Sequence, residues 1–548
     1  MVIDSNGKQH ASPQTQSRHS YLASLTTRIK RSMATKWHRS QIGHRSEYSI
    51  ERFLAFRDYY ESTSMTHAIA VCALTPLPAL LTALLIDCIP LRHPSEGWQA
   101  NYGVWIRQFL AMFFESVGVV FQMREVVEAR TISITGAVKI GLGTAVSSVL
   151  VTIIVADLWK FPIPFGFVFL INVYVLLFAT SMILVIGPQV LKSSPTLRAQ
   201  IKAQLFIIAN QGVFIAKQNI ANAAESYHEY VGPLLVFSVD LFNVYYVAIC
   251  MESSTALATT FTMMVADSLH LVLSLRSVLC RPKLVQEPSK SNATQCVCYL
   301  EEISSILRNT VAHKSPQILH RRVRLLAPFP LRLSNDCKSM IRKLAKSGKF
   351  SNDGFASRRC SKNSISTRKA STLSKPSRIA KLHHRVTPTT LATVLLPQRG
   401  PILSDLIVSS GASIGIVVNS SRSGVFDGLQ ILFQSEYIIL AEYIEFIVPT
   451  LYAPYLPALF HLPVAEYYPH TATLTSDNLS RAIINILTYA AIEFAGFSAL
   501  VLLFKRTLGF SPLYQLAFVL ETHAFAIQGH LFVWTLAILH LTLMHHGT

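Results

Sequence analysis

The chain has 548 residues, of which 51% are hydrophobic and 14% charged, and its mean hydropathy is +0.37. Soluble domains carry about 25% charged residues, so this composition excludes an ordinary soluble enzyme, whose apolar interior the few charges could not cover. The net charge of +19 is unevenly placed: residues 276–401 hold 25 Lys and Arg against 5 Asp and Glu, residues 1–65 hold 10 against 5, and the remainder holds 14 against 20. Apolar segments separated by basic ones predict a multi-pass membrane protein with cytoplasmic basic parts.

Residues 1–66 form a basic N-terminal region, and no secretory signal peptide is expected before the first apolar stretch near His67. Between Leu22 and Trp37, apolar side chains recur every three or four residues, which suits either a basic amphipathic helix at a membrane interface or a merely disordered segment. The same composition suits a mitochondrial presequence, so a mitochondrial location stays as an alternative.

Residues 67–275 predict a first transmembrane bundle, because a helix needs about 20 apolar residues to cross the bilayer. Pro76 and Pro78 are expected to kink its first span. The shorter apolar stretch at 203–216 suits an interfacial or re-entrant segment. Six windows qualify as spans: 67–88, 104–123, 135–156, 161–191, 230–251 and 254–275.

Residues 403–548 predict a second bundle of three to five spans, for about ten in all. Residues 403–420 suit a full or a half span, and residues 428–465, which contain four prolines, suit one long broken helix or two short ones. Residues 482–504 and 522–544 are clear spans. If 428–465 counts as one span, the position of Lys505 and Arg506 depends on 403–420. The two residues lie on the non-cytoplasmic side when 403–420 spans the membrane fully, and on the cytoplasmic side when it does not.

The basic N-terminus and six spans place residues 276–402 in the cytoplasm, with the protein in the plasma membrane or another endomembrane. This loop is rich in Ser, Lys, Arg and Pro, so we expect it to be mostly disordered. Residues 338–350 form a possible basic helix that could bind anionic lipid headgroups or a calmodulin-like partner. Ser361 and Ser371 each follow a basic pair and are candidate phosphorylation sites. No nucleic-acid motif accompanies the charge, so no nucleic-acid partner is predicted.

Ionisable side chains inside spans are costly and point to function. Glu442 and Glu445 share a helical face, as do Asp267 and His270, so either pair could carry protons or bind a cation. Interhelical hydrogen bonding or a place near the interface is the structural alternative for each residue. The candidate intramembrane polar site comprises Glu115, Asp240, Asp267, His270, Glu442, Glu445 and Glu493, and Glu436, Glu521 and His523 are further ionisable residues in the predicted spans.

Enzyme motifs are missing from the sequence: it has no Gly-rich phosphate loop, no H-E-x-x-H and no nucleophile elbow. The C-x-C of Cys296 and Cys298 has no second ligand pair at zinc spacing. We therefore predict no enzymatic activity, no resident metal and no cofactor.

The chain contains the strings Tyr48-Ser-Ile-Glu-Arg, Cys72-Ala-Leu-Thr-Pro-Leu-Pro-Ala-Leu, Ile86-Asp-Cys-Ile-Pro-Leu-Arg, Pro94-Ser-Glu-Gly-Trp-Gln-Ala-Asn-Tyr, Trp105-Ile-Arg, Trp159-Lys-Phe-Pro-Ile-Pro-Phe-Gly, His228-Glu-Tyr-Val-Gly-Pro, Phe237-Ser-Val-Asp, Phe460-His-Leu-Pro and Gln515-Leu-Ala-Phe-Val-Leu-Glu-Thr. Together these strings resemble a large, uncharacterised family of multi-pass membrane proteins in oomycetes. The similarity covers most of residues 48–540 outside the basic segment and implies a membrane protein, but it implies no activity. The chain departs from that family by lacking apolar sequence between Gly212 and Val213.

The sequence thus predicts an all-α polytopic helix bundle with a long disordered basic loop. Its mid-span carboxylates and proline-broken helices favour a proton- or cation-coupled transporter or channel-like protein for a small solute. The alternative is a membrane receptor or scaffold whose basic loop binds anionic lipid or protein partners.

Overall fold

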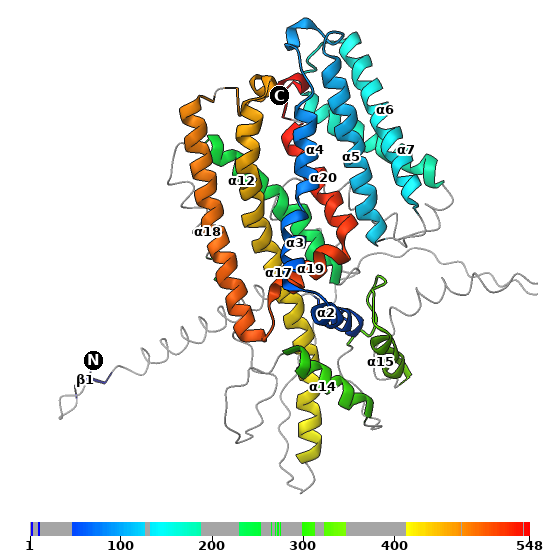
Figure 1. The fold of residues 1–548 in the computed structure, drawn as a ribbon, viewed down its shortest axis with the longest axis vertical. Coiled ribbons are helices and arrows are strands. Elements are labelled where there is room, and N and C mark those ends of the chain that lie inside the picture. The colour runs from blue at the N-terminus through cyan, green and yellow to red at the C-terminus, as the bar shows by residue number, and fades with distance from the viewer. Residues whose placement is uncertain are drawn as a thin grey trace, which may run out of the picture.

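A computed structural model of the chain describes residues 46–126, 132–187, 229–253, 299–312, 323–346, 413–472, 474–540 and 542–547, with a few isolated positions (Figure 1). Within these ranges the chain is helical apart from its connections, and near the N-terminus β1 (Val2–Ile3) pairs antiparallel with β2 (Gln9–His10). Six helices are long and apolar enough to cross a membrane, or up to seven if a bent pair counts as one span. The predicted all-α polytopic membrane bundle is confirmed.

The first predicted span is two helices, α3 (Met65–Leu74) and α4 (Leu77–Asp87), which together cover Met65–Asp87. The break falls at Thr75 and Pro76, and the predicted proline kink explains it because a proline has no amide hydrogen to donate to the preceding turn. A short helix, α2 (Ile50–Ser62), precedes the span, and η2 (Pro94–Glu96) follows it.

The next three spans are α5 (Tyr102–Val126), α6 (Ile134–Leu158) and α7 (Gly166–Ile186). The α7 helix begins later than the apolar window at 161–191, because Pro162 and Pro164 disfavour helical backbone in the residues before them. The fifth span is continuous in composition but changes its winding, from α11 (Val231–Leu235) through the π-helical η4 (Val236–Asp240) to α12 (Leu241–Ser253).

After the basic segment, α17 (Ser413–Phe460) is one helix of 48 residues with Pro449, Pro454 and Pro457 inside it. The single-helix alternative for residues 428–465 is therefore the observed one, although the 3-10 helix η5 (Pro463–Tyr467) forms its end. The next span, α18 (Ser476–Leu508), is longer than its predicted window. Last come α19 (Pro512–Thr522) and α20 (Ala524–His540), bent by 83° at His523, and η6 (Met544–His546).

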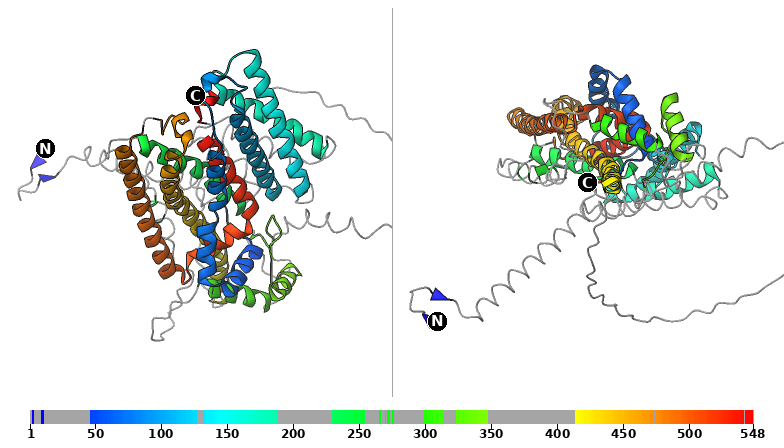
Figure 2. Two further views of the ribbon diagram at one scale, coloured as in Figure 1. Left: turned by 45° about the horizontal axis from the view of Figure 1, so that its top comes forward. Right: turned by 90° about the horizontal axis from the view of Figure 1, so that it is seen from below.

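The two ends of the bundle carry different elements (Figure 1). We call the end with α2, α14 (Tyr299–Ala312) and α15 (Asn335–Lys346) the proximal end, and the end with η2, η5 and the C-terminus the distal end. The α17 helix starts at the proximal end and runs through the bundle, and α18 returns beside it (Figures 1 and 2). Lys505 and Arg506, in the last turn of α18, therefore lie at the same end as α2. Of the possible span at 403–420, residues 413–420 belong to α17 and residues 403–412 lie outside the described residues.

Helices from before and after the basic segment share one interior. The α20 helix packs against α5 and α4, and α12 packs against α17 and α18. At one crossing, the backbones of Gly118 in α5 and Gly529 in α20 touch, and a Cβ atom on Gly118 would lie 2.7 Å from the Gly529 carbonyl oxygen. Only glycine permits so close an approach of two helices.

Two stretches of the predicted basic loop, residues 299–312 and 323–346, pack on the protein, and the rest of the loop lies outside the described residues. Leu300, Ile303 and Leu307 of α14 and Val323 and Leu325 lie in the largest hydrophobic core. The spacing of the three α14 residues puts them on one face of the helix. Their burial holds this part of the chain against the bundle. Residues 338–346 of the basic helix predicted at 338–350 belong to α15, and residues 347–350 lie outside the described residues. Residues 203–216 and the N-terminal amphipathic segment lie outside the described residues, as does most of 254–275.

Candidate functional site

Three glutamates meet between α17 and α18. Glu442 and Glu445 are three residues apart on α17, so they share a helical face, and Glu493 faces them from α18. One carboxylate oxygen from each residue lies within 4.8 Å of the others. Glu442 and Glu493 are buried, and Glu445 is partly exposed. We call these three residues the glutamate cluster.

The glutamate cluster lies deep in the bundle. Glu493 is near the middle of the 33-residue α18, about 25 Å along the axis from either end at 1.5 Å per residue. Its neighbours are aromatic: the Phe446 ring centroid lies 4.7 Å from that of Phe497 and 5.6 Å from that of Phe494. The two buried carboxylates, Glu442 and Glu493, therefore lie in apolar surroundings near the middle of α18, which is one of the six helices long and apolar enough to cross a membrane, whereas α17 is not among those six.

Three carboxylates so close together favour the binding of protons or of a cation. Two ionised carboxylates at this separation repel each other by about 3 kcal/mol at an effective dielectric constant of 20. Protons shared among the three groups, or a bound cation, would relieve that repulsion. Carboxylate oxygens are the ligands that hard cations such as Ca²⁺ and Mg²⁺ prefer, so the residues fit a cation held as cargo.

A buried ionic cluster fixes α17 on the proximal side of the glutamates. The Arg52 guanidinium of α2 lies 2.8 and 2.9 Å from the two carboxylate oxygens of Glu436. The Tyr48 hydroxyl also donates to Glu436, and Arg52 Nη1 lies 3.2 Å from Nε2 of His523, at the bend between α19 and α20. We call Tyr48, Arg52, Glu436 and His523 the Arg52 cluster. Its four side chains join three chain segments within the protein interior: the start of α2, α17 and the bend between α19 and α20.

A second buried cluster lies at the distal end, around Asp87 at the end of α4. The hydroxyls of Tyr455 and Tyr468 donate to its two carboxylate oxygens at 2.7 and 2.6 Å. Arg107 Nη1 lies 3.4 Å and His540 Nδ1 lies 3.3 Å from Asp87 Oδ1. Since Glu436 and Tyr455 both belong to α17, these two clusters hold that helix on either side of Glu442 and Glu445.

The structure brings together three of the predicted site residues and leaves two apart. Glu115 is buried on α5, which packs against α6 and α20, and its Oε1 has no hydrogen-bond partner. Asp240 is buried at the end of the π-helical segment, away from the glutamate cluster. Asp267 and His270 lie outside the described residues, as do Ser361 and Ser371.

Arg52 and Asp87 were not among the predicted site residues. Arg52 precedes the first apolar window, and Asp87 is next to the last residue of that window, where a charged side chain ordinarily reaches water. Only their burial, to 0% exposure in each case, reveals their role.

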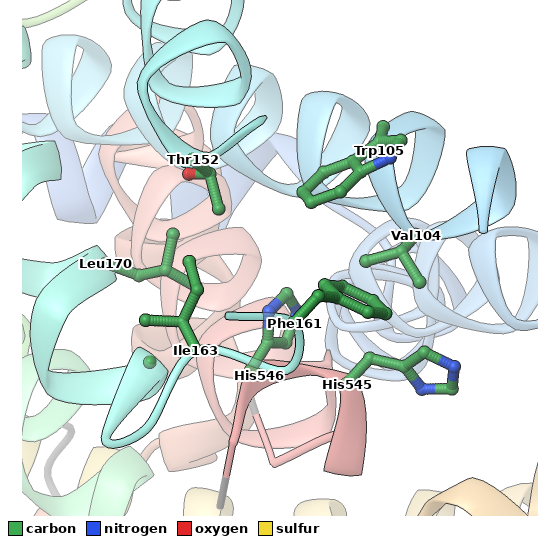
Figure 3. Close-up of a pocket in the computed structure, with 9 residues that line it drawn as sticks. Val104, Trp105, Thr152, Phe161, Ile163, Leu170, His545 and His546 are labelled. Atoms are coloured by element: carbon green, nitrogen blue, oxygen red, sulfur yellow. The ribbon is translucent and has the colours of Figure 1, made fainter. Parts of the chain in front are cut away.

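The C-terminal residues close a small pocket at the distal end. Figure 3 shows Trp105, Phe161, His545 and His546 around it, with Thr152 on the opposite wall. His545 Nε2 lies 2.7 Å from the carbonyl oxygen of Arg92. Burial lowers the pKa of His546 to about 3 and also lowers that of His545, so both rings are neutral near pH 7. The pocket lining contains no carboxylate, so it does not offer the ligands of the glutamate cluster.

Comparison of the chain with protein families, with curated proteins and with solved structures finds no match.

Proposed function

We propose that this multi-pass membrane protein carries protons or a small inorganic cation across its membrane, with the glutamate cluster as the binding site. The convergence of Glu442, Glu445 and Glu493 in the bundle interior supports this function. A carboxylate in a membrane interior is expensive, and three of them at one point are difficult to explain by packing alone.

The surroundings of the glutamate cluster suit an exchange of protons for a cation. Two of the ligands come from α17 and the third from α18, so a small movement of one helix against the other would change the distance between carboxylates. A tighter group favours cation or proton binding and a looser one favours release. The Arg52 and Asp87 clusters fix α17, which leaves α18 as the helix that moves.

Flux measurements on the full chain in liposomes test this proposal. Vesicles containing a pH-sensitive dye are given a proton gradient, and parallel vesicles are given gradients of Na⁺, K⁺ or Ca²⁺. The wild-type protein should collapse at least one gradient faster than empty vesicles do. Glu493→Gln and Glu442→Gln should each slow that flux at least tenfold, because either change removes a ligand and a charge.

Glu466→Gln is the matched control. Glu466 is exposed in η5, outside the spans, and its substitution removes the same charge as Glu493→Gln does. The ion flux of the Glu466→Gln variant should therefore equal that of the wild type. The proposal fails if the wild-type protein moves none of the four ions, or if Glu493→Gln and Glu466→Gln behave alike. Retained folding of each variant is checked by its melting temperature in detergent.

A further inference from the structure

The basic helix α15 is fastened to α2 by its apolar side. Cys337, Ile341 and Leu344 are buried in the largest hydrophobic core. Two polar contacts add to this packing at the start of the helix. The Cys337 thiol donates to Asp58 Oδ1 at 3.1 Å, and the Ser334 amide donates to Asp58 Oδ2 at 2.9 Å.

The opposite side of α15 is basic and exposed. At 100° per residue, Lys338, Arg342 and Lys346 form one row, with Lys343 beside them, across the helix from the buried residues. All four side chains are exposed. Asp336 is the one acidic residue of this helix. Docking on α2 therefore leaves a positively charged surface, which we call the α15 basic face.

The position of α15 places this surface close to a membrane. Its contacts are with α2, which ends at Ser62, and the first apolar span begins at Met65. The helix is thus held next to the point where the first span enters the bilayer. Figure 1 shows α15 beside α2 at the proximal end.

We propose that the α15 basic face binds the anionic headgroups of the leaflet at the proximal end. Clustered Lys and Arg next to a span attract anionic lipid, with a contribution of roughly fivefold in affinity for each cation. A calmodulin-like partner is less well matched, since it grips the apolar face of a helix. That face is already covered here, with Leu344 0% exposed.

Lipid binding by the full chain in neutral detergent tests the inference. The protein is titrated with short-chain phosphatidylserine and, separately, with short-chain phosphatidylcholine. In the test variant, the four cations of the basic face are changed to glutamine (K338Q, R342Q, K343Q and K346Q). The wild type should prefer phosphatidylserine, and the variant should bind it at least tenfold more weakly. The preference should also shrink in high salt, which screens exposed charges.

The control removes four charges elsewhere in the same basic segment (R358Q, R359Q, R368Q and K369Q). It has the same net charge as the test variant but keeps the α15 basic face, so its affinity for phosphatidylserine should stay within twofold of the wild type. A second variant that keeps the charge (K338R, K343R and K346R) should also bind normally, and it separates loss of charge from loss of folding. If the test and control variants lose the same affinity for phosphatidylserine, the inference is overturned, because binding would then depend on the net charge of the segment and not on the α15 basic face. It is also overturned if the wild type shows no preference for phosphatidylserine over phosphatidylcholine, whether or not Ca²⁺-loaded calmodulin binds the chain.

Discussion

Replacement of Arg52 by Met should destabilise the protein strongly, because it leaves Glu436 buried without its counter-charge. Both side chains are almost completely buried, at 0% and 1% exposure, and the ion pair is 2.8 Å long. Loss of one partner of a buried ion pair costs about 3–5 kcal/mol, most of it the penalty for the charge left behind. The Arg52 guanidinium also lies 5.0 Å from the ring centroid of Tyr48, a further contact that the substitution removes.

The ion pair can be isolated by a double-mutant cycle. Arg52→Met and Glu436→Gln should each cost about 3–5 kcal/mol, and the double variant should cost roughly 3 kcal/mol less than the sum of the two. Unfolding in mixed micelles with increasing sodium dodecyl sulfate gives the free energies. The solvated pair Arg92 and Glu96, at 3.3 Å and 60% and 45% exposure, is the control; its cycle should give less than about 1 kcal/mol.

Two results would refute this reasoning. If Arg52→Met costs less than about 1 kcal/mol, Glu436 is not trapped in a dry interior. If the two single costs simply add, the two side chains do not interact, and the Arg52 cluster does not hold α2 against α17.

Three further predictions concern packing and pH. Gly529→Ala should cost about 1–3 kcal/mol or more in micelle unfolding, since its Cβ meets helix backbone, whereas Gly496→Ala, with nothing within 4 Å, should be neutral or slightly stabilising. Ile303→Ala should cost about 2–5 kcal/mol in the same assay if α14 belongs to the core, as its 0% exposure indicates; an effect below 0.5 kcal/mol, the range typical of surface changes, would contradict this. Because burial lowers the pKa of His546 to about 3 from 6.5, the detached segment binds a proton that the docked segment does not. Docking should therefore weaken as pH falls from about 6.5 toward 3, by up to 1.4 kcal/mol per pH unit. Amide exchange of the C-terminal residues should be faster at pH 5 than at pH 7 after correction for intrinsic rates. His546→Phe should reduce that difference and leave the part that the lowered pKa of His545 contributes.

The sequence by itself determined the class of the protein and most of its spans. Long runs with few charges can lie only in a membrane or a core. The predicted windows match the boundaries of α5 and α6 to within three residues and those of α7 and α18 to within six. The proline kink in the first span was predictable for the same reason: it follows from local backbone chemistry. The paired positions of Glu442 and Glu445 were likewise fixed by the helical repeat.

Only the tertiary structure decided which distant residues meet. Glu493, Glu115 and Asp240 are all acidic residues inside apolar windows, and the sequence around them does not show which one meets Glu442. That depends on which helices pack together. Burial of Arg52 and Asp87 was also hidden. Arg52 lies before the first apolar window and Asp87 at the end of it, and only neighbouring helices remove these two side chains from water. Within the basic segment, the composition did not single out α14 and α15, whose few apolar residues pack into the largest hydrophobic core. Contacts between residues hundreds of positions apart depend on the packing of the whole chain, which no local window contains.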